Sequence, residues 1–378
     1  MAQPRPVGLL LLLLACACAC APTAAPPAAP TAAPQATTAP QAASAAAPTA
    51  AAPATTAAQA PTTPPPTAAA QPAATTLTVV NTAVTGAFGG FWTAIEAGYF
   101  RDEAIEIQIT NVDSTSRGIA VLLAGEAQFS TLDGQTIIAA DVKGGDLRAV
   151  AAATNRLVFS VMVDPSIKSP ADLKGKKMGI TTPGSSTDTA ARQALAIWKL
   201  EPASDVALVP LASSPNILTG MTAKQIEAGV LSPPTNTRAR LGGFQELISL
   251  AKDGPEYPSV TFGATQSYLS KNPQVVLGFV RAYSRGLHRF KTDQPFAVRT
   301  LAKYLQLDDQ AVLEDTWQQF TPIFPDIPYV SPKGVQNAIE TVAQTVPEAA
   351  GAAPERFVDS GFVRQLEDGG FYKQLLGS

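Results

Sequence analysis

The chain has 378 residues, a formal net charge of −3 and one histidine, and its basic residues form no stripe, which disfavours nucleic-acid binding. Its three cysteines, Cys16, Cys18 and Cys20, all lie near the N-terminus. The rest of the chain therefore offers no cysteine nucleophile and no Cys/His zinc cluster. A Ser-His-Asp triad could use only His288, which lies in an amphipathic helical pattern typical of a surface or packing residue. We expect neither an enzyme nor a bound metal or cofactor.

Residues 1–15 are typical of an export signal. Arg5 precedes an apolar run that is too short to span a bilayer. The stretch LLAC, which ends at Cys16, resembles a bacterial lipobox, and the resemblance implies cleavage before Cys16 and attachment of lipid to its sulfur. Cys18 and Cys20 also follow an alanine, so each is an alternative acceptor. An ordinary secretory signal with incidental cysteines is the other interpretation.

The segment after the cysteines has a restricted composition. Residues 21–76 contain only Ala, Pro, Thr, Gln and one Ser. Such a segment cannot bury enough apolar surface to offset the entropy lost on ordering. We predict that residues 16–76 form a disordered tether, which begins at the lipidated cysteine and holds the following domain off a membrane surface.

From residue 77 onward about 300 residues remain, a length that predicts two lobes or domains. Strand patterns alternate with helical patterns, which predicts an α/β fold with a mainly parallel sheet. The predicted strands include residues 77–81, 105–109, 147–155, 157–163, 206–211, 226–232 and 257–265. Residues 272–378 are mostly helical. This order assigns residues 77–163 and 259–378 to a first lobe and residues 164–258 to an inserted second lobe.

The stretch GITTPGSSTDTAARQAL, residues 179–195, predicts a strand end, a turn and a helix. Ser185, Ser186 and Thr187 lie at the predicted helix start, where free backbone N–H groups and the helix dipole favour an anion. No lysine follows Gly184, so the turn is not a phosphate-binding P-loop. Each hydroxyl either contacts a ligand or only caps its own helix, and we predict that at least one contacts a ligand.

Further candidate ligand residues lie in small polar loops at predicted strand ends, where ligands of α/β sheets bind. They are Phe88, Trp92, Ser116, Thr131, Asp133 and Pro233. Asp133 could accept a hydrogen bond from a ligand N–H, or it could cap the helix that follows. Phe88 and Trp92 could wall the site, although core packing is the more frequent role for at least one of them. Ser116 lies at a helix start, and Pro233 more often shapes a loop than contacts a ligand.

Several motifs occur in order along residues 77–371. They are FWTAIEAGYFRDEAIEIQI, LLAGEAQFSTLDG, SIKSPADLKGKKMGITTPGSSTD, IEAGVLSPP and YLSKNPQVVLGFVRAYSRGL. In this order they resemble the substrate-binding proteins of ABC importers, in the branch for nitrate, sulfonate, taurine and thiamine precursors. The resemblance implies a two-lobed, periplasmic-binding-protein-like fold of type II. Its hinge strands would cross near residues 152–163 and 257–265, with the ligand between the lobes.

The same resemblance implies the function and the partners. We expect a monomeric lipoprotein on the outer face of the cytoplasmic membrane, anchored through lipid alone. It would deliver a small anion, such as a sulfonate or nitrate, to an ABC permease and its ATPase. If Asp133 faces the ligand, an amino-sulfonate or a pyrimidine-like molecule is favoured over nitrate. The alternatives are a related pyrimidine-precursor synthase, whose cysteine-rich motif is absent here, and a ligand-sensing co-receptor.

Overall fold

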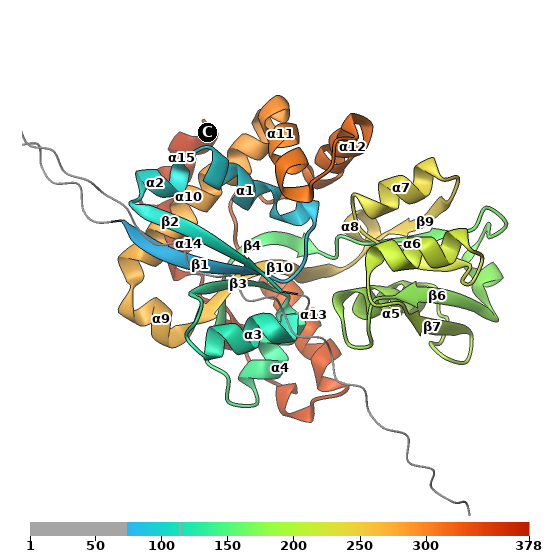
Figure 1. Cartoon of the computed structure of the whole chain (residues 1–378). Helices are drawn as coiled ribbons and strands as arrows, with labels where there is room; N and C mark the ends of the chain where they lie inside the picture. Colours follow the sequence, from blue (N-terminus) through green and yellow to red (C-terminus); the bar gives the residue numbers. More distant parts are fainter. Residues whose placement is uncertain (1–73, 113–114, 378) are drawn as a thin grey trace, which may run out of the picture. The chain divides into compact units, whose positions relative to one another are not determined.

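The computed structural model describes residues 74–112 and 115–377 (Figure 1). The predicted signal segment, Cys16 and nearly all of the predicted tether lie outside these residues. The first strand, β1, begins at Thr75, so it includes the last two residues that the sequence assigned to the tether.

The first sheet has the strand order β2-β1-β3-β10-β4. Its strands are β1 Thr75–Asn81, β2 Ile105–Asn111, β3 Phe129–Leu132, β4 Leu147–Arg156 and β10 Glu256–Thr265. β1 pairs in parallel with β2 and β3, whereas β10 pairs antiparallel with both β3 and β4. Four strands therefore run in one direction, and only β10 is reversed.

The second sheet repeats this plan in the order β7-β6-β8-β5-β9. Its strands are β5 Ser160–Val163, β6 Lys176–Ile180, β7 Val206–Pro210, β8 Ala228–Leu231 and β9 Gln245–Ser249. β6 pairs in parallel with β7 and β8, and β5 pairs antiparallel with β8 and β9. Here β5 is the reversed strand. In each sheet the reversed strand is the one that the chain enters directly from the other sheet.

The two-sheet α/β fold agrees with the sequence prediction, but the lobe boundary differs. The sequence assigned residues up to 163 to the first lobe, whereas β5 pairs within the second sheet. The apolar pattern of 157–163 identifies a buried strand, but a buried strand has the same pattern in either sheet. We call the first sheet with its helices the first lobe, and the second sheet with its helices the second lobe.

Helices cover both faces of the first sheet (Figure 1). The helices on one side share an apolar cluster with the sheet. They are α1 Gly89–Glu96, α2 Tyr99–Asp102, α9 Gln266–Lys271, α10 Pro273–Thr292, α11 Gln294–Leu305, α12 Gln310–Phe320, α14 Gly361–Asp368 and α15 Phe371–Leu376. The other face packs against α3 Thr115–Leu123, α4 Gly134–Asp141 and α13 Pro332–Ala343. The short helices are η1 Gly86–Phe88, η3 Pro347–Ala349 and η4 Pro354–Phe357. The second lobe contains η2 Pro170–Leu173, α5 Ser186–Ile197, α6 Ser214–Thr222, α7 Thr235–Leu241 and α8 Leu250–Asp253.

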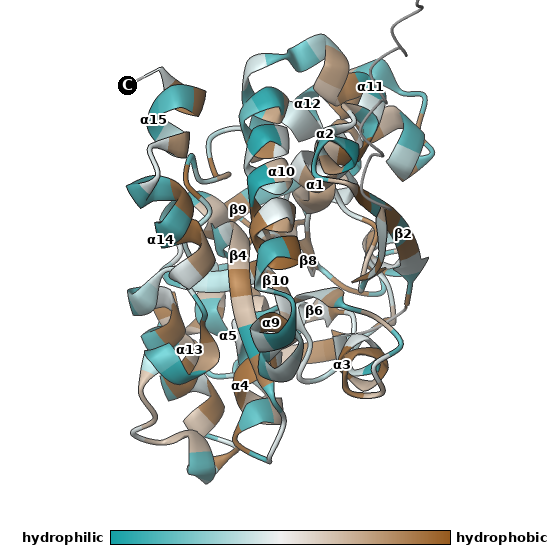
Figure 2. Ribbon diagram, turned by 90° about the vertical axis from the view of Figure 1, so that its left-hand side faces the viewer, coloured by the Kyte–Doolittle hydropathy of each residue, from teal (hydrophilic) through white to brown (hydrophobic). Residues whose placement is uncertain are grey.

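Buried aromatic rings fill the core between the first sheet and α10. Phe129 stacks on Phe279 with ring centroids 4.1 Å apart, and Phe262 meets Tyr283 edge to face at 4.7 Å. Figure 2 shows hydrophobic residues along β4. It also shows both hydrophobic and hydrophilic residues on α10, α13 and α14, as expected of helices with one apolar face. A second apolar cluster contains side chains of both lobes, such as Ile138 and Val161. The two lobes therefore share part of their apolar core.

Helices α1 and α10 approach closely because glycines face each other across their contact. A Cβ atom added at Gly286 would overlap the carbonyl oxygen of Gly90 and lie 2.5 Å from the Cβ of Ala94. At Gly278, on the same helix, an added Cβ would lie 3.3 Å from the Glu103 side chain, which is tight but is contact with a flexible group.

This difference makes a prediction about stability. Gly286→Ala should lower the free energy of unfolding by about 1–3 kcal/mol, because it overpacks a helix–helix contact. Gly278→Ala should be neutral or stabilising by up to about 1 kcal/mol, because alanine is the better helix former. Urea unfolding of both variants checks this, and equal midpoints would contradict the close approach at Gly286.

Candidate functional site

The ends of β1 and β3 are joined by two threonines. The Thr82 amide donates to the Thr131 hydroxyl at 3.0 Å, and the Thr82 hydroxyl donates to the Thr131 carbonyl at 3.0 Å. The buried Thr131 hydroxyl also lies 3.4 Å from the Val80 carbonyl, to which it can donate. Thr131, a predicted ligand residue, thus ties together two strand ends at the edge where the predicted site lies.

The turn from β6 into α5 is built from three hydroxyls that bond one another. The hydroxyl oxygens of Thr181, Ser185 and Thr187 lie 2.8–2.9 Å apart in each pair. Ser185 is the N-cap of α5, where its side chain accepts from the Asp188 amide, and Thr187 accepts from the Thr181 amide at 2.8 Å. Both hydroxyls therefore have partners within their own turn. Capping accounts for the Ser185 hydroxyl, whereas the Thr187 hydroxyl bonds the amide that follows β6 and caps no helix.

Ser186 makes a different contact, because its hydroxyl reaches the other lobe. It donates to Oδ2 of Asp133 at 3.0 Å. Three residues further along α5, the Thr189 hydroxyl donates to Oε1 of Gln135 at 2.8 Å, and the hydroxyl of the hinge residue Tyr257 donates to the same oxygen at 3.2 Å. The first turns of α4 and α5 thus meet directly across the two lobes. Of the three predicted hydroxyls, Ser186 is the one that faces the first lobe.

Asp133 is a buried carboxylate with two roles at this junction. Its side chain is the N-cap of α4 and accepts from the Thr136 amide at 2.8 Å, while its second oxygen accepts from Ser186. Only 5% of the residue is exposed. Burial raises the pKa of Asp133 above its ordinary value, because the charged form loses water, and the hydrogen bonds from Thr136 and Ser186 offset this only in part. Burial, and secondly the charge of Asp133, also raises the pKa of Tyr257.

The predicted aromatic residues lie in the core of the first lobe. Phe88 and Trp92 are 3% and 1% exposed and form an edge-to-face pair with centroids 5.8 Å apart. Trp92 also stacks on Tyr304 at 4.9 Å, with the ring planes 7° from parallel. In this arrangement neither ring presents a free face to the lobe junction.

The two remaining candidates lie on opposite lobes. Ser116 is exposed in the first turn of α3. Pro233 is buried, and its carbonyl oxygen accepts from the Thr85 hydroxyl at 3.4 Å, so the loop after β8 meets the loop after β1. The structure therefore brings Asp133 and Ser186 together, and Pro233 close to Thr85. It does not bring Ser116 into these contacts.

Thr85, Gln135 and Thr189 take part in the junction but are absent from the sequence-based set. Gln135 follows Asp133 by two residues, and Thr189 lies one helical turn after Ser185, on the face of α5 that is buried. A spacing of four residues from Ser185 was the available signal for Thr189, whereas Gln135 lies two residues from Asp133, a separation that does not place side chains on one helix face. Thr85 lies in the small loop after β1, where the sequence favoured the neighbouring aromatic residues.

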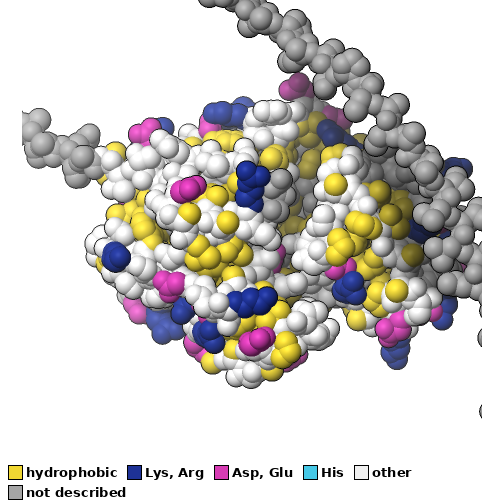
Figure 3. Space-filling model, turned by 60° about the horizontal axis from the view of Figure 1, so that its bottom comes forward, with side chains coloured by type: hydrophobic (Ala, Val, Ile, Leu, Met, Phe, Trp, Pro, Cys, Tyr) yellow, Lys and Arg dark blue, Asp and Glu magenta, His cyan; other side chains and the backbone are white. Residues whose placement is uncertain are grey.

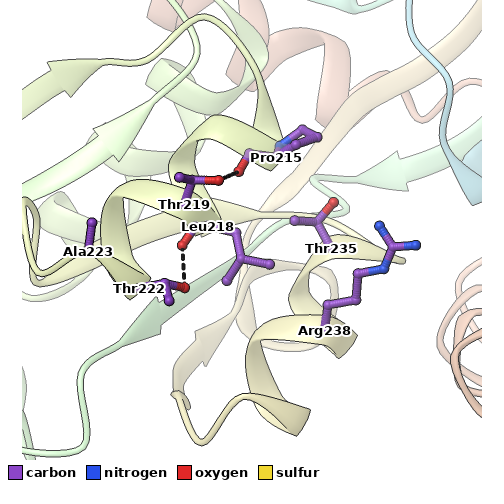
Figure 4. A pocket seen from close by; sticks show the side chains of 7 residues that line it. All are labelled: Pro215, Leu218, Thr219, Thr222, Ala223, Thr235 and Arg238. Carbon is purple, nitrogen blue, oxygen red and sulfur yellow. Dashed lines mark hydrogen bonds between the residues drawn. The ribbon is translucent and has the colours of Figure 1, made fainter.

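A cavity of about 430 Å³ lies elsewhere, between α6 and α7 of the second lobe. It is lined by Pro215, Leu218, Thr219, Thr222, Ala223, Thr235 and Arg238 (Figure 4). The hydroxyls of Thr219 and Thr222 donate to the carbonyls of Pro215 and Leu218 within α6. None of the predicted ligand residues lines this cavity, so we place the candidate site at the lobe junction.

Across residues 74–112 and 115–377, no group of three or more His, Cys, Asp or Glu residues could hold a metal ion. None of the helices in these residues combines the length and the apolar composition that a membrane span requires. On the face shown in Figure 3, the described Lys and Arg side chains are interspersed with Asp and Glu rather than gathered in one patch.

The buried carboxylate predicts a pH-dependent effect on stability. Because the folded-state pKa of Asp133 is raised, the protein loses stability, relative to a neutral variant, as the pH rises through that folded-state pKa. Asp133→Asn keeps an acceptor for the Thr136 amide without the charge. Its free energy of unfolding should exceed that of the wild type at neutral pH, and the gap should close at acidic pH.

Urea unfolding between about pH 3.5 and pH 7.5 measures this gap. Asp309 offers a matched control, since it caps α12 in the same way but is exposed to water. Asp309→Asn should change the free energy of unfolding little, because Asn caps a helix about as well as Asp. A gap for Asp133→Asn that is constant with pH would contradict the assigned environment.

Known proteins resemble this chain in sequence and in fold. A family model described as NMT1/THI5 like matches residues 85–295. A protein of Brucella abortus that is described only as a binding protein is 32% identical over 170 residues, which is 43% of this chain and 51% of that protein. The chain thus spans about half the length of the curated relative it matches.

Two solved structures illustrate the fold. The periplasmic aliphatic sulphonate binding protein SsuA of Escherichia coli is 18% identical, with a TM-score of 0.62 over 79% of this chain and 99% of SsuA. The periplasmic nitrate-binding protein NrtA of Synechocystis PCC 6803 is 13% identical, with a TM-score of 0.62 over 78% of this chain and 89% of NrtA. The periplasmic-binding-protein fold expected from the sequence motifs is confirmed, and the family match covers more than half of the chain. The chain belongs to the NMT1/THI5-like family.

Proposed function

We propose that this protein is an extracytoplasmic solute-binding protein, which captures a small molecule between its lobes and delivers it to an ABC importer. The observation that carries the proposal is the contact between Ser186 and Asp133. Both residues belong to helix starts that follow the carboxyl end of a strand, which is where α/β sheets bind ligands. Closing two such edges over a ligand excludes water and strengthens each hydrogen bond.

Binding without catalysis suits the chemistry of these residues. The hydroxyls of Thr181, Ser185 and Thr187 bond one another rather than a general base. His288 lies on α10, a helix that supplies none of the junction residues. The relatives named above are described as binding proteins, and two of them as periplasmic ones. We therefore assign the protein a transport role and no reaction.

The proposed ligand is a small anion that also carries an N–H group. The first turn of α5 favours negative charge, because its free N–H groups and the helix dipole point outward. Asp133 lies beside that turn and would accept from an amine or ring N–H. An amino-sulfonate combines both features. SsuA and NrtA, described as binding sulphonates and nitrate, share the fold and support an anionic part.

We further propose that the chain is anchored through lipid on Cys16, so that the tether of residues 16–76 holds the two lobes near the permease. The LLAC motif supports this proposal. Metabolic labelling with a radioactive fatty acid tests it: Cys16→Ser should abolish incorporation. If incorporation survives Cys16→Ser and is lost only in Cys18→Ser or Cys20→Ser, the lipid is attached to that other cysteine instead.

A thermal-shift screen tests the ligand class. We expect taurine to raise the melting temperature more than methanesulfonate or nitrate does, because its amine meets Asp133 while its sulfonate meets α5. A ligand at a hundredfold excess over its dissociation constant stabilises the folded state by about 2.7 kcal/mol. An uncharged aminopyrimidine is the comparison compound. A shift with the aminopyrimidine and none with any anion would overturn the anionic assignment.

Two alanine variants separate ligand contact from a purely structural role in the turn. Thr187→Ala removes the acceptor of the Thr181 amide in a buried turn, so it should cost about 1–3 kcal/mol of stability. Ser186→Ala should cost less stability and should reduce the ligand-induced shift more. Urea unfolding and the shift with the best ligand of the screen measure the two effects. The reverse ranking would mean that Ser186 has only a structural role.

A further inference from the structure

A second set of contacts joins the lobes, between α7 of the second lobe and α12 of the first. It consists of Asn236, Thr237 and Arg240 on α7 and Asp315 and Gln319 on α12. Asp315 and Gln319 lie four residues apart, so they occupy the same face of α12. None of these residues belongs to the Asp133–Ser186 junction.

The carboxylate of Asp315 accepts most of the hydrogen bonds from α7. Its Oδ2 accepts from the Thr237 hydroxyl and, at 2.6 Å, from the Arg240 guanidinium. The Arg240 guanidinium also lies 3.7 Å from Glu246 of its own lobe, so it has a carboxylate partner on both sides. Arg240 and Asp315 are about one-third exposed, and an isolated pair of this kind contributes little by itself.

The side-chain amide of the half-buried Gln319 completes the network. Its nitrogen donates to the Thr237 hydroxyl at 3.1 Å, and its oxygen accepts from Nδ2 of Asn236 at 2.9 Å. Asn236 is 0% exposed. Without α12, the donor nitrogen Nδ2 of Asn236 would keep a 3.5 Å contact to the Ser160 hydroxyl, while its Oδ1 would keep the Thr237 hydroxyl at 3.4 Å. Parting the lobes therefore strips partners from polar groups that are otherwise buried, which is costly unless water replaces them.

Helix α12 also packs on the loop that carries part of the candidate site. A Cβ atom added at Gly86 would lie 2.6 Å from side-chain atoms of both Thr316 and Phe320. The neighbouring Thr85 bonds the Pro233 carbonyl, and Pro233 lies just before α7. The helix that binds α7 thus also supports the loop after β1.

We propose that Asp315 and Gln319 act as a latch on α7, which holds the lobes together and so positions the Asp133–Ser186 junction. The two residues are positioning residues, which act on ligand affinity without touching the ligand. This inference rests on the proposed function for its biological meaning. A latch that favours the closed arrangement raises the fraction of binding-competent protein, and the apparent affinity rises with that fraction.

Hydrogen–deuterium exchange of the ligand-free full chain tests the latch. Asp315→Ala, alone and with Gln319→Ala, should speed amide exchange in residues 133–137 and 185–190, which contribute no side chain to the latch. We expect an acceleration on the order of tenfold in the double variant. If the alanine variants fold poorly, Asp315→Asn, which removes the charge at nearly constant shape, should give a smaller acceleration in the same segments.

Asp102→Asn is the matched control, because Asp102 pairs with Arg285 at 2.8 Å within the first lobe. It should leave exchange in both distant segments unchanged. Faster exchange confined to α7 and α12 would overturn the latch, as would equal acceleration in the control. Combining Asp315→Ala with Thr237→Ala should give less than the sum of the two single effects, because both variants break the Thr237–Asp315 contact and Asp315→Ala alone also removes the Arg240 contact. Full additivity would overturn the assignment of Asp315 to α7.

The exchange experiment contains no ligand, so its outcome is independent of the ligand screen. If amide exchange at the junction accelerates but no compound raises the melting temperature, the latch is supported and the proposed ligand class is rejected. A ligand that binds, together with unchanged exchange in every latch variant, would reject the latch and keep the proposed function.

Discussion

Two crossings of the chain join the sheets, and they are hydrogen-bonded to each other. The Leu250 amide, at the return crossing, donates to the Phe159 carbonyl of the outgoing crossing at 2.9 Å. Leu157 and Tyr257 are buried in the apolar cluster that both lobes share. The chain enters each sheet from the opposite direction at these crossings, so the entering strands β5 and β10 pair antiparallel with their neighbours. The carboxyl ends of the remaining strands are thereby free to form the polar loops of the junction.

The polar groups of the junction find their partners within the protein. Hydroxyls at the start of α5 bond one another, and those that face the first lobe bond Asp133 and Gln135. A ligand that bonds these hydroxyls would exchange one hydrogen-bond partner for another, and such an exchange has a small net free energy. A small net free energy of binding at these hydroxyls is compatible with reversible capture and release of a ligand. The hydrogen bonds between α7 and α12 lie outside this set of hydroxyls, so the latch that we propose does not depend on the chemistry of the ligand.

Much of the local structure could be read from the residues. The turn at residues 179–195 follows from Pro183, Gly184 and the hydroxyls that precede an apolar helical pattern. The N-cap at Asp133 follows from the same reasoning. The pattern could not reveal which hydroxyl caps and which crosses to the other lobe. Adjacent residues of a helix start point in different directions, and the position of the facing lobe decides which of them meets a partner.

The sequence by itself determined the alternation of strands and helices, the repeated two-lobed plan and the family-like order of motifs, because periodicity and turn residues act over short distances. Only the tertiary structure decided that β5 belongs to the second sheet, that Phe88 and Trp92 pack in the core, and that Asn236 meets Gln319. These outcomes join residues far apart in the chain, whose contacts depend on how whole elements pack. No local pattern of apolar and polar residues encodes them.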